Sequence, residues 1–233
     1  MIALLSDIHS NIYALDAVLK DMPKVSVAYV LGDTVGGANP FPCQVLDTLM
    51  NLDMRVSAIL GNWEAWMINV RHDIPPEWRG DGTKIAAGAW TMDVMKEHHW
   101  NFLEGLGTDL CVDDMLLFHG SPESLKDEII CQDSAEELAK RHNAKWLIGG
   151  HTHKARLFRV GSHRVVNVGS VGLSCDCIGG TACYALLDED NIIFRHVSYD
   201  LESAVKAIEN SELFTLAGDF SRQTISIMKS GSF

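Results

Sequence analysis

The sequence predicts an α/β fold, in which strands and helices alternate along the chain. Three observations predict it. Short apolar runs alternate with segments of helical periodicity in the first 62 residues. Later apolar runs are joined by very short turns, which are typical of antiparallel hairpins. Several apolar runs end directly in acidic, amide or imidazole side chains, the pattern of a site at the carboxyl edge of a sheet.

The first part of the chain indicates parallel strands. We expect buried strands at 2–6, 27–33 and 55–62. A helix is expected between each pair. The first runs from Ile12 to Leu19 after an N-cap residue, Asn11, and the second covers 43–52. A strand–helix–strand–helix–strand order implies parallel pairing through right-handed crossovers.

The pattern changes between residues 63 and 108, which hold most of the tryptophans. We expect a loop at 73–82, helices at 83–99 and 100–106, and no strand. This stretch is therefore predicted to be a helical insertion that covers a site. The whole chain, 1–233, is predicted to be a single domain, since its length suits one domain with an inserted cap.

Strands resume after the insertion. The expected elements are a strand at 114–120, a helix at 134–142 opened by Asp133 or Ser134, a strand and loop at 145–153, and strands at 154–160, 164–170, 181–188 and 191–197. The turns at 161–163 and 189–191 predict two antiparallel hairpins. A helix is expected at 200–209, while 210–233 is left open as helical or loose.

Composition and charge exclude some classes of function. The chain has 31 acidic and 19 basic residues, a formal charge of −12, which argues against binding long nucleic acid through its phosphates. Metal ions can still hold a phosphate substrate, because an ion's local charge outweighs the global sum. The first residues do not read as a signal peptide or membrane helix, and the six cysteines include no C-x-x-C pair. We therefore expect a cytoplasmic protein with free thiols and no membrane partner.

Five stretches end an apolar run with side chains that ligate metals. They are Asp7-x-His9, Gly32-Asp33, Gly61-Asn62, His119-Gly120 and Gly150-His151-Thr152-His153. Together they offer two carboxylates, one amide oxygen and four imidazoles, and no thiolate. Such oxygen and nitrogen donors suit Mn²⁺, Fe, Zn²⁺ or Co, and Mg²⁺ less well. Each stretch alone is weak evidence, but five in succession at predicted strand ends indicate one site. A metal or redox role for the C-x-C of Cys175 and Cys177 is left open.

These stretches resemble the signature blocks of calcineurin-like metallophosphoesterases: "SDIHSN" (6–11), "LGDTVGGANP" (31–40), "LGNWE" (60–64), "FHGSP" (118–122) and "GGHTH" (149–153). "NVGSVG" (167–172) and "ACYALLD" (182–188) are similar to the small bacterial and archaeal phosphodiesterase branch that includes dinucleoside polyphosphate hydrolases. The resemblance implies a four-layer α/β/β/α sandwich of two mixed sheets with two divalent ions between them, with Mn²⁺ preferred and Fe, Zn, Ni, Co or Mg as alternatives.

The resemblance also implies a role for each ligand position. Asp7, His9 and His153 would hold the first ion. Asn62, His119 and His151 would hold the second, and Asp33 would bridge the two. We expect the ions to produce a hydroxide that attacks phosphorus in line, so that Asp33, Asn62 and His119 act in catalysis through it. No protein nucleophile is expected.

Trp63 departs from the family pattern. Many members carry histidine directly after the Gly-Asn, where it protonates the leaving oxygen. Indole is only a hydrogen-bond donor, so this chain lacks that general acid. His72, His98 or His99 in the insertion could replace it. We count Trp63, Glu64 and His72 as candidate substrate contacts. Glu64 is alternatively a support for the ligands or a helix-opening acid. The tryptophans either stack on a nucleobase or simply pack.

The expected function is hydrolysis of a small phosphodiester or nucleoside polyphosphate, whose leaving groups need no proton. The partner would be a small phosphorylated molecule, nucleotides included, and the oligomeric state is left open. Alternatives are a protein serine/threonine phosphomonoesterase, which the missing acid disfavours, a scaffold without activity, which is expected to lose ligands, and a nuclease, which the negative charge disfavours.

Overall fold

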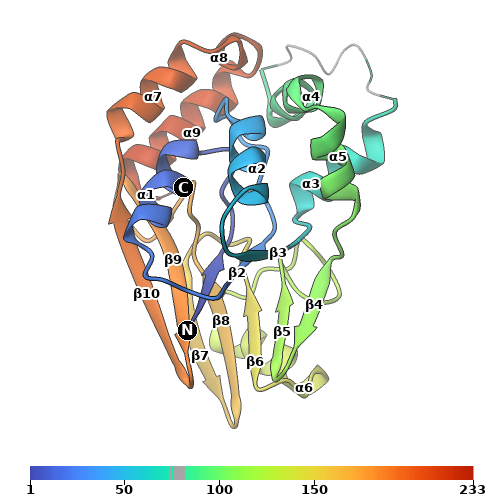
Figure 1. Ribbon diagram of the computed structural model, residues 1–233, viewed down its shortest axis with the longest axis vertical. Helices are drawn as coiled ribbons and strands as arrows, with labels where there is room; N and C mark the ends of the chain where they lie inside the picture. Colours follow the sequence, from blue (N-terminus) through green and yellow to red (C-terminus); the bar gives the residue numbers. More distant parts are fainter. Residues whose placement is uncertain (74, 76–81, 233) are drawn as a thin grey trace.

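The computed structural model of the chain describes residues 1–73, 75 and 82–232. Two five-stranded mixed sheets pack face to face with helices outside them, which confirms the expected four-layer α/β/β/α sandwich (Figure 1). The expected loop at 73–82, with Trp78, lies almost entirely outside the described residues. Among the described residues, no helix is long and apolar enough to cross a membrane.

The first sheet has the order β10-β9-β1-β2-β3. Its parallel centre is formed by β1 (Ile2–Leu5), β2 (Val27–Leu31) and β3 (Arg55–Ile59). The crossovers are α1 (Ile12–Asp21), capped by Asn11 as expected, and α2 (Pro42–Met50). The hairpin of β9 (Thr181–Asp188) and β10 (Asn191–Ser198) adds antiparallel to β1.

The second sheet has the order β4-β5-β6-β8-β7. Its parallel strands are β5 (Met115–Phe118), β6 (Trp146–Gly149) and β8 (His163–Val168). The edges, β4 (Asp109–Val112) and β7 (Ala155–Val160), run antiparallel to their neighbours. The predicted hairpins, β7–β8 and β9–β10, are both present.

Alternation along the strands builds the layers. Leu4 of β1 and Leu117 of β5 face the core between the sheets, whereas Leu5 faces α1 and α2, and Phe118 faces α6 (Gln132–Arg141). Neighbouring residues of a strand point to opposite faces, so each sheet is apolar on both sides. Such sheets read as continuous apolar runs in the sequence.

The stretch between β3 and β4 holds α3 (Asn62–Val70), α4 (Lys84–Val94) and α5 (Glu97–Glu104). The helix expected over 83–99 is wrong, because the backbone is extended at Met95 and Lys96. The imidazole Nδ1 of His99 accepts the Lys96 N–H at 3.1 Å and starts a new helix there. Apolar periodicity does not reveal such a cap, because it depends on one side chain.

Other boundaries also differ from the expectations. The strand expected at 55–62 ends at Ile59, because Asn62 already begins α3, and β4 was not predicted. The helix α6 begins two residues before the expected start, with Cys131 as its N-cap and Ser134 inside its first turn. Edge strand β4 is only half-buried, so its sequence carries little apolar signal.

The end of the chain is helical: α7 (Leu201–Glu209), α8 (Glu212–Leu216) and α9 (Gly218–Ser230). Figure 1 shows these helices with α4 and α5 at the same end of the molecule, above the strands. Leu213 and Ala217 pack on Ala86 and Ala87 of α4. The stretch between β3 and β4 therefore packs on the end of the chain through apolar side chains.

Gly88 marks the contact of α4 with α3. A Cβ atom at this position would lie 2.1 Å from Cζ3 of Trp66. Alanine is the better helix former by about 1 kcal/mol, but overpacking costs about 1–3 kcal/mol. We therefore expect Gly88→Ala to lower the free energy of unfolding by up to about 2 kcal/mol in urea denaturation. The control is Gly105→Ala, where the new Cβ meets nothing closer than 3.4 Å; an equal loss in both variants would contradict this packing.

Candidate metal centre

The seven polar side chains singled out in the sequence lie together between the two sheets. They follow the carboxyl ends of β1 (Asp7, His9), β2 (Asp33), β3 (Asn62), β5 (His119) and β6 (His151, His153). Because these strands are parallel within each sheet, their carboxyl ends share an edge, and the two packed sheets bring the edges together.

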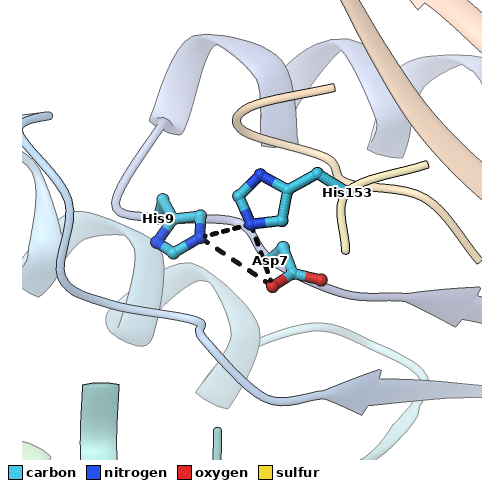
Figure 2. A group of neighbouring side chains, drawn as sticks. All are labelled: Asp7, His9 and His153. Carbon is cyan, nitrogen blue, oxygen red and sulfur yellow. Dashed lines mark hydrogen bonds and ion pairs between the residues drawn. The ribbon is translucent and has the colours of Figure 1, made fainter. Parts of the chain in front are cut away.

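Asp7, His9 and His153 form a first group, whose candidate ligand atoms all lie within 4.8 Å of one another. Figure 2 shows the two imidazole rings directed at the carboxylate. The Nε2 atom of His153 is 3.3 Å from Asp7 Oδ1, and that of His9 is 3.8 Å from it. The two Nε2 atoms are 3.1 Å apart. All three residues are buried.

Asp33, His119 and His151 form a second group with the same compactness. His119 Nε2 lies 3.5 Å from Asp33 Oδ2 and 3.2 Å from Asn62 Oδ1. The rings of His119 and His151 meet edge to face, with centroids 5.1 Å apart. His151 is half-buried, so this group is the more open of the two.

Two carboxylates join the groups. Asp33 Oδ2 is 3.8 Å from His9 Nε2 in the first group, and Asp7 Oδ1 is 3.9 Å from His119 Nε2 in the second. Asp33 therefore stands between the two sets of imidazoles. Its Oδ2 atom lies 3.8 Å from His9 Nε2 and 3.5 Å from His119 Nε2.

Backbone carbonyls fix the tautomers of two rings. Nδ1 of His119 lies 2.7 Å from the Leu31 oxygen, and Nδ1 of His153 lies 2.9 Å from the Leu173 oxygen. Each Nδ1 must donate its proton to that oxygen, so in the neutral ring the Nε2 lone pair faces the carboxylates. Without a metal, Nε2 of both rings carries a second proton, because the carboxylates raise the pKa of His119 and His153. A divalent metal fits the same set of donors and would supply that positive charge instead.

One carboxylate oxygen of the cluster, Oδ1 of Asp7, shows the same need for positive charge. Asp7 Oδ1 is buried without a hydrogen-bond partner, although the other oxygen of the same carboxylate accepts the His151 N–H at 2.9 Å. A buried, unpaired carboxylate oxygen is costly. The seven residues thus fit a metal centre by the atom that lacks a partner and by the ligand chemistry.

The pKa values reflect the same imbalance. Burial disfavours a charged ring, but the Asp33 and Asp7 carboxylates outweigh it and raise the pKa of His119 to about 9. Asp7 in the same way raises the pKa of His153 to about 10. Burial instead lowers the pKa of His9 to about 4. Burial alone would raise the pKa of Asp7, yet His153 and His119 hold it well below its usual range. The cluster accordingly attracts positive charge.

The backbone at the site is strained. Asp7, His9, Asp33, His151 and His153 all have positive φ values, between 47° and 69°. Non-glycine residues rarely adopt this region, and the cost is about 1–3 kcal/mol each. Backbone hydrogen bonds offset the cost of this conformation. The N–H groups of Asp7 and His9 donate to the oxygens of Gly32 and Asp33 at 3.0 and 2.9 Å.

Glu64 holds the loops of β2 and β3 together from behind. Its carboxylate accepts the N–H groups of Asp33, Val35 and Gly61 at 2.9–3.0 Å. Burial and the neighbouring Asp33 raise its pKa to about 7. Glu64 does not line the open cavity, so its place among the substrate contacts is corrected. The sequence was compatible with Glu64 as a substrate contact and with Glu64 as a support for the ligands. Its contacts with three backbone N–H groups favour the second role.

Trp63 lies at the wall of a cavity of about 550 Å³ that opens beside the metal-ligand candidates. Its backbone N–H donates to Asp33 Oδ1 at 2.9 Å. Its ring packs so closely on Gly36 that a Cβ there would approach it to 2.6 Å, and it meets Trp66 and Phe220 at centroid distances of 6.1 and 6.0 Å. Trp63 is therefore both a cavity wall and a packing residue.

The other histidines of the insertion do not join the site. His72 is exposed at the end of α3 and lines a separate cavity with Arg71 and Trp100, which corrects its assignment as a substrate contact. His98 and His99 bind Asp47 at 3.1 and 3.0 Å. Because His99 Nδ1 accepts the Lys96 N–H, its proton must be on Nε2, which donates to Asp47. That ring has no lone pair left for a metal.

Cys175 and Cys177 do not form a common site. Cys175 is buried with its thiol 3.5 Å from the Leu173 oxygen, whereas Cys177 is exposed. The cavity is also lined by residues that the sequence did not single out: Lys84 of α4, Lys154 and Arg156 after His153, and Phe220 and Gln223 of α9. Lysines, arginines and aromatic residues are common on helices, so only the tertiary contacts single these out.

The chain is similar to known proteins along most of its length. The profile of the calcineurin-like phosphoesterase superfamily domain matches residues 1–191. An uncharacterized protein of Methanocaldococcus jannaschii is 27% identical over 240 residues, which cover 91% of this chain and 93% of that protein.

Two crystal structures share the fold over almost the whole chain. A metallophosphoesterase from Sphaerobacter thermophilus is similar with a TM-score of 0.81 and 22% identity, covering 99% of each chain. A hypothetical protein from Pyrococcus horikoshii OT3 has a TM-score of 0.80 and 20% identity, covering 100% of this chain and 99% of that chain. The similarity thus includes α7–α9, which lie beyond the residues that the family profile matches.

Glu64 provides a test of how the site is supported. In Glu64→Gln an NH₂ group replaces one of the oxygens that accept backbone N–H groups, so buried donors face each other. We expect the free energy of unfolding to fall by about 2 kcal/mol, measured by urea denaturation. The control is Glu104→Gln, which removes an exposed ion pair with Arg71 and should cost less than about 1 kcal/mol. Equal losses would show that Glu64 does not hold the loops.

Proposed function

Because the chain belongs to the calcineurin-like phosphoesterase superfamily, a family of metal-dependent hydrolases, we propose that it hydrolyses a small phosphodiester or a nucleoside polyphosphate with two divalent ions. The observation that carries the proposal is the convergence of seven oxygen and nitrogen ligand candidates in two adjoining groups, in which the buried Asp7 Oδ1 has no hydrogen-bond partner. A protein that used this fold only as a scaffold would have no need to keep such a cluster.

Each ion would be held by one of the two groups. Asp7, His9 and His153 would hold the first ion, and Asn62, His119 and His151 the second. Asp33 would be shared, which its distances of 3.8 Å to His9 and 3.5 Å to His119 support. Without thiolates, this set of donors suits Mn²⁺ best, with Fe, Zn²⁺, Ni²⁺, Co²⁺ or Mg²⁺ as alternatives.

The ions, when bound, would supply the charge that holds a phosphate and lowers the pKa of a water molecule, so that a nucleophile exists at neutral pH. The chain's residues keep that charge from being cancelled. Only two of the ligands, Asp7 and Asp33, are anions, and Asn62 contributes a neutral oxygen. Backbone carbonyls orient His119 and His153, so that both rings present Nε2.

The position after Asn62 bears on the substrate. Trp63 offers no proton, and its ring is fixed by Gly36, Trp66 and Phe220. Among the described residues, the histidines outside the ligand set do not line the cavity. Leaving groups that depart as stable anions, such as phosphate or aryl oxide, are therefore favoured over the alkoxide of phosphoserine.

The aromatic residues of this cavity support a nucleotide as the substrate. The ring planes of Trp63 and Phe220 are inclined at 34° to each other, and both residues line the cavity. Aromatic surfaces of this kind bind nucleobases by stacking. We place the reaction in the cytoplasm, since all six cysteines are free thiols, as expected in a reducing compartment.

The ligand assignment is tested by Asp33→Asn and His119→Ala. Each variant should bind fewer than two metal ions per chain after preparation with Mn²⁺, measured by elemental analysis, and kcat/KM should fall at least about 10²-fold. Asp53→Asn, at an exposed position before β3, is the control and should keep both values. Full metal content and activity in either site variant would refute the assignment.

The missing acid is tested by a substrate comparison with the Mn²⁺-loaded enzyme. We expect bis(p-nitrophenyl) phosphate and ATP to be cleaved at least about 10²-fold faster, in kcat/KM, than a phosphoserine peptide, because general acid catalysis contributes about 10²–10⁴-fold. Initial rates of phosphate or nitrophenol release provide the measurement. The reverse ranking would show that another group supplies the proton.

A further inference from the structure

The cavity beside the seven ligands is larger than one phosphate requires. Its volume is about 550 Å³, within the range of cavities that enclose whole small-molecule ligands. A second cavity of about 280 Å³ adjoins it, and the two share Asn62, Trp63 and Lys84 in their walls. There is room next to the metal centre for a substantial part of the substrate.

The walls of these cavities are cationic, unlike the protein as a whole. Lys84, Lys154 and Arg156 line the larger cavity, and Lys84 and Lys126 line the smaller one. Apart from the ligand Asp33, Glu128 is the acidic residue among the described residues of these walls. The cavity walls are therefore positively charged, although the chain as a whole has 31 acidic and only 19 basic residues. Such a field attracts an anion beyond the phosphate at the metal centre.

Lys84 has the position best suited to bind that anion. It is exposed at the first residue of α4, and no ion pair to it occurs within residues 1–73, 75 and 82–232. It lines both cavities together with Asn62 and Trp63. Arg156, in contrast, already donates to the Ile130 backbone oxygen. Lys84 therefore faces the space beside the residue where a general acid is missing.

We propose that Lys84 binds a second, non-scissile phosphate of the substrate, which makes the enzyme selective for phosphoanhydrides of nucleosides over isolated diesters. This inference rests on the proposed function. Water adds to the scissile phosphorus, and the bond from that phosphorus to the bridging oxygen breaks. The leaving phosphate keeps the bond's electron pair, and the proton of the water goes to solvent. The ammonium group stabilises the charge that the leaving phosphate gains, so no acid has to protonate it.

The experiment compares two substrates, ATP and bis(p-nitrophenyl) phosphate, on the Mn²⁺-loaded wild type and three variants. The quantity measured is the ratio of kcat/KM for ATP to kcat/KM for the diester. We expect Lys84→Gln to lower this ratio at least tenfold and Lys84→Arg to restore most of it. Lys24→Gln, at an exposed lysine before β2 and thus at the opposite end of that strand, should leave the ratio at the wild-type value.

A binding measurement adds a readout that is independent of turnover. Calorimetric titration of the metal-free protein with ADP should show at least tenfold weaker binding to Lys84→Gln than to the wild type, and unchanged binding to Lys24→Gln. A wild type that cleaves neither substrate overturns the proposed function. A wild type that cleaves the diester, with the ratio and the ADP affinity unchanged in Lys84→Gln, overturns the inference alone.

Discussion

The arrangement of this protein depends on one electrostatic constraint: two buried carboxylates, Asp7 and Asp33, need positive charge beside them, and the surrounding imidazoles supply it only while they are protonated. Asp7 Oδ1 has no hydrogen-bond partner, and backbone carbonyls prevent His119 and His153 from turning away. A buried anion of this kind is stable only beside positive charge. Folding therefore prepares a site whose affinity for cations is built into the orientation of its rings.

Holding that site costs backbone strain, and the surrounding loops offset it. Five of the seven candidate ligands have left-handed backbone conformations, and the loop after β1 is hydrogen-bonded along its length to the loop after β2. The buried carboxylate of Glu64 accepts hydrogen bonds from three N–H groups in the loops after β2 and β3. The ligands thus lie on irregular segments, but these segments are fastened to one another and to two rigid sheets, as a preorganised site requires.

The strands, and the gathering of the polar residues that follow them, were predictable from local patterns in the sequence, whereas the four-layer arrangement and the ligand roles were implied by the resemblance to the family. Apolar runs define strands, and the polar residues directly after them must lie at one edge. The break at Lys96 was not predictable, since it depends on the ring of His99. Nor was the role of Glu64, because its partners Asp33 and Val35 are about 30 positions away and are recognised through their backbone. The cavity residues Lys84 and Phe220 come together only through the packing of α4 against α8 and α9.

The packing of Trp63 has a consequence for how such an enzyme can change its chemistry. Its indole packs between Gly36, Trp66 and Phe220, so it joins the loop after β2 to helices α3 and α9. A histidine placed there would leave part of this space empty, and buried voids are destabilising. Introducing a proton donor at this position would therefore demand compensating changes on three separate segments. The side chain allowed after Asn62 is thus limited by steric fit as well as by the need for an acid.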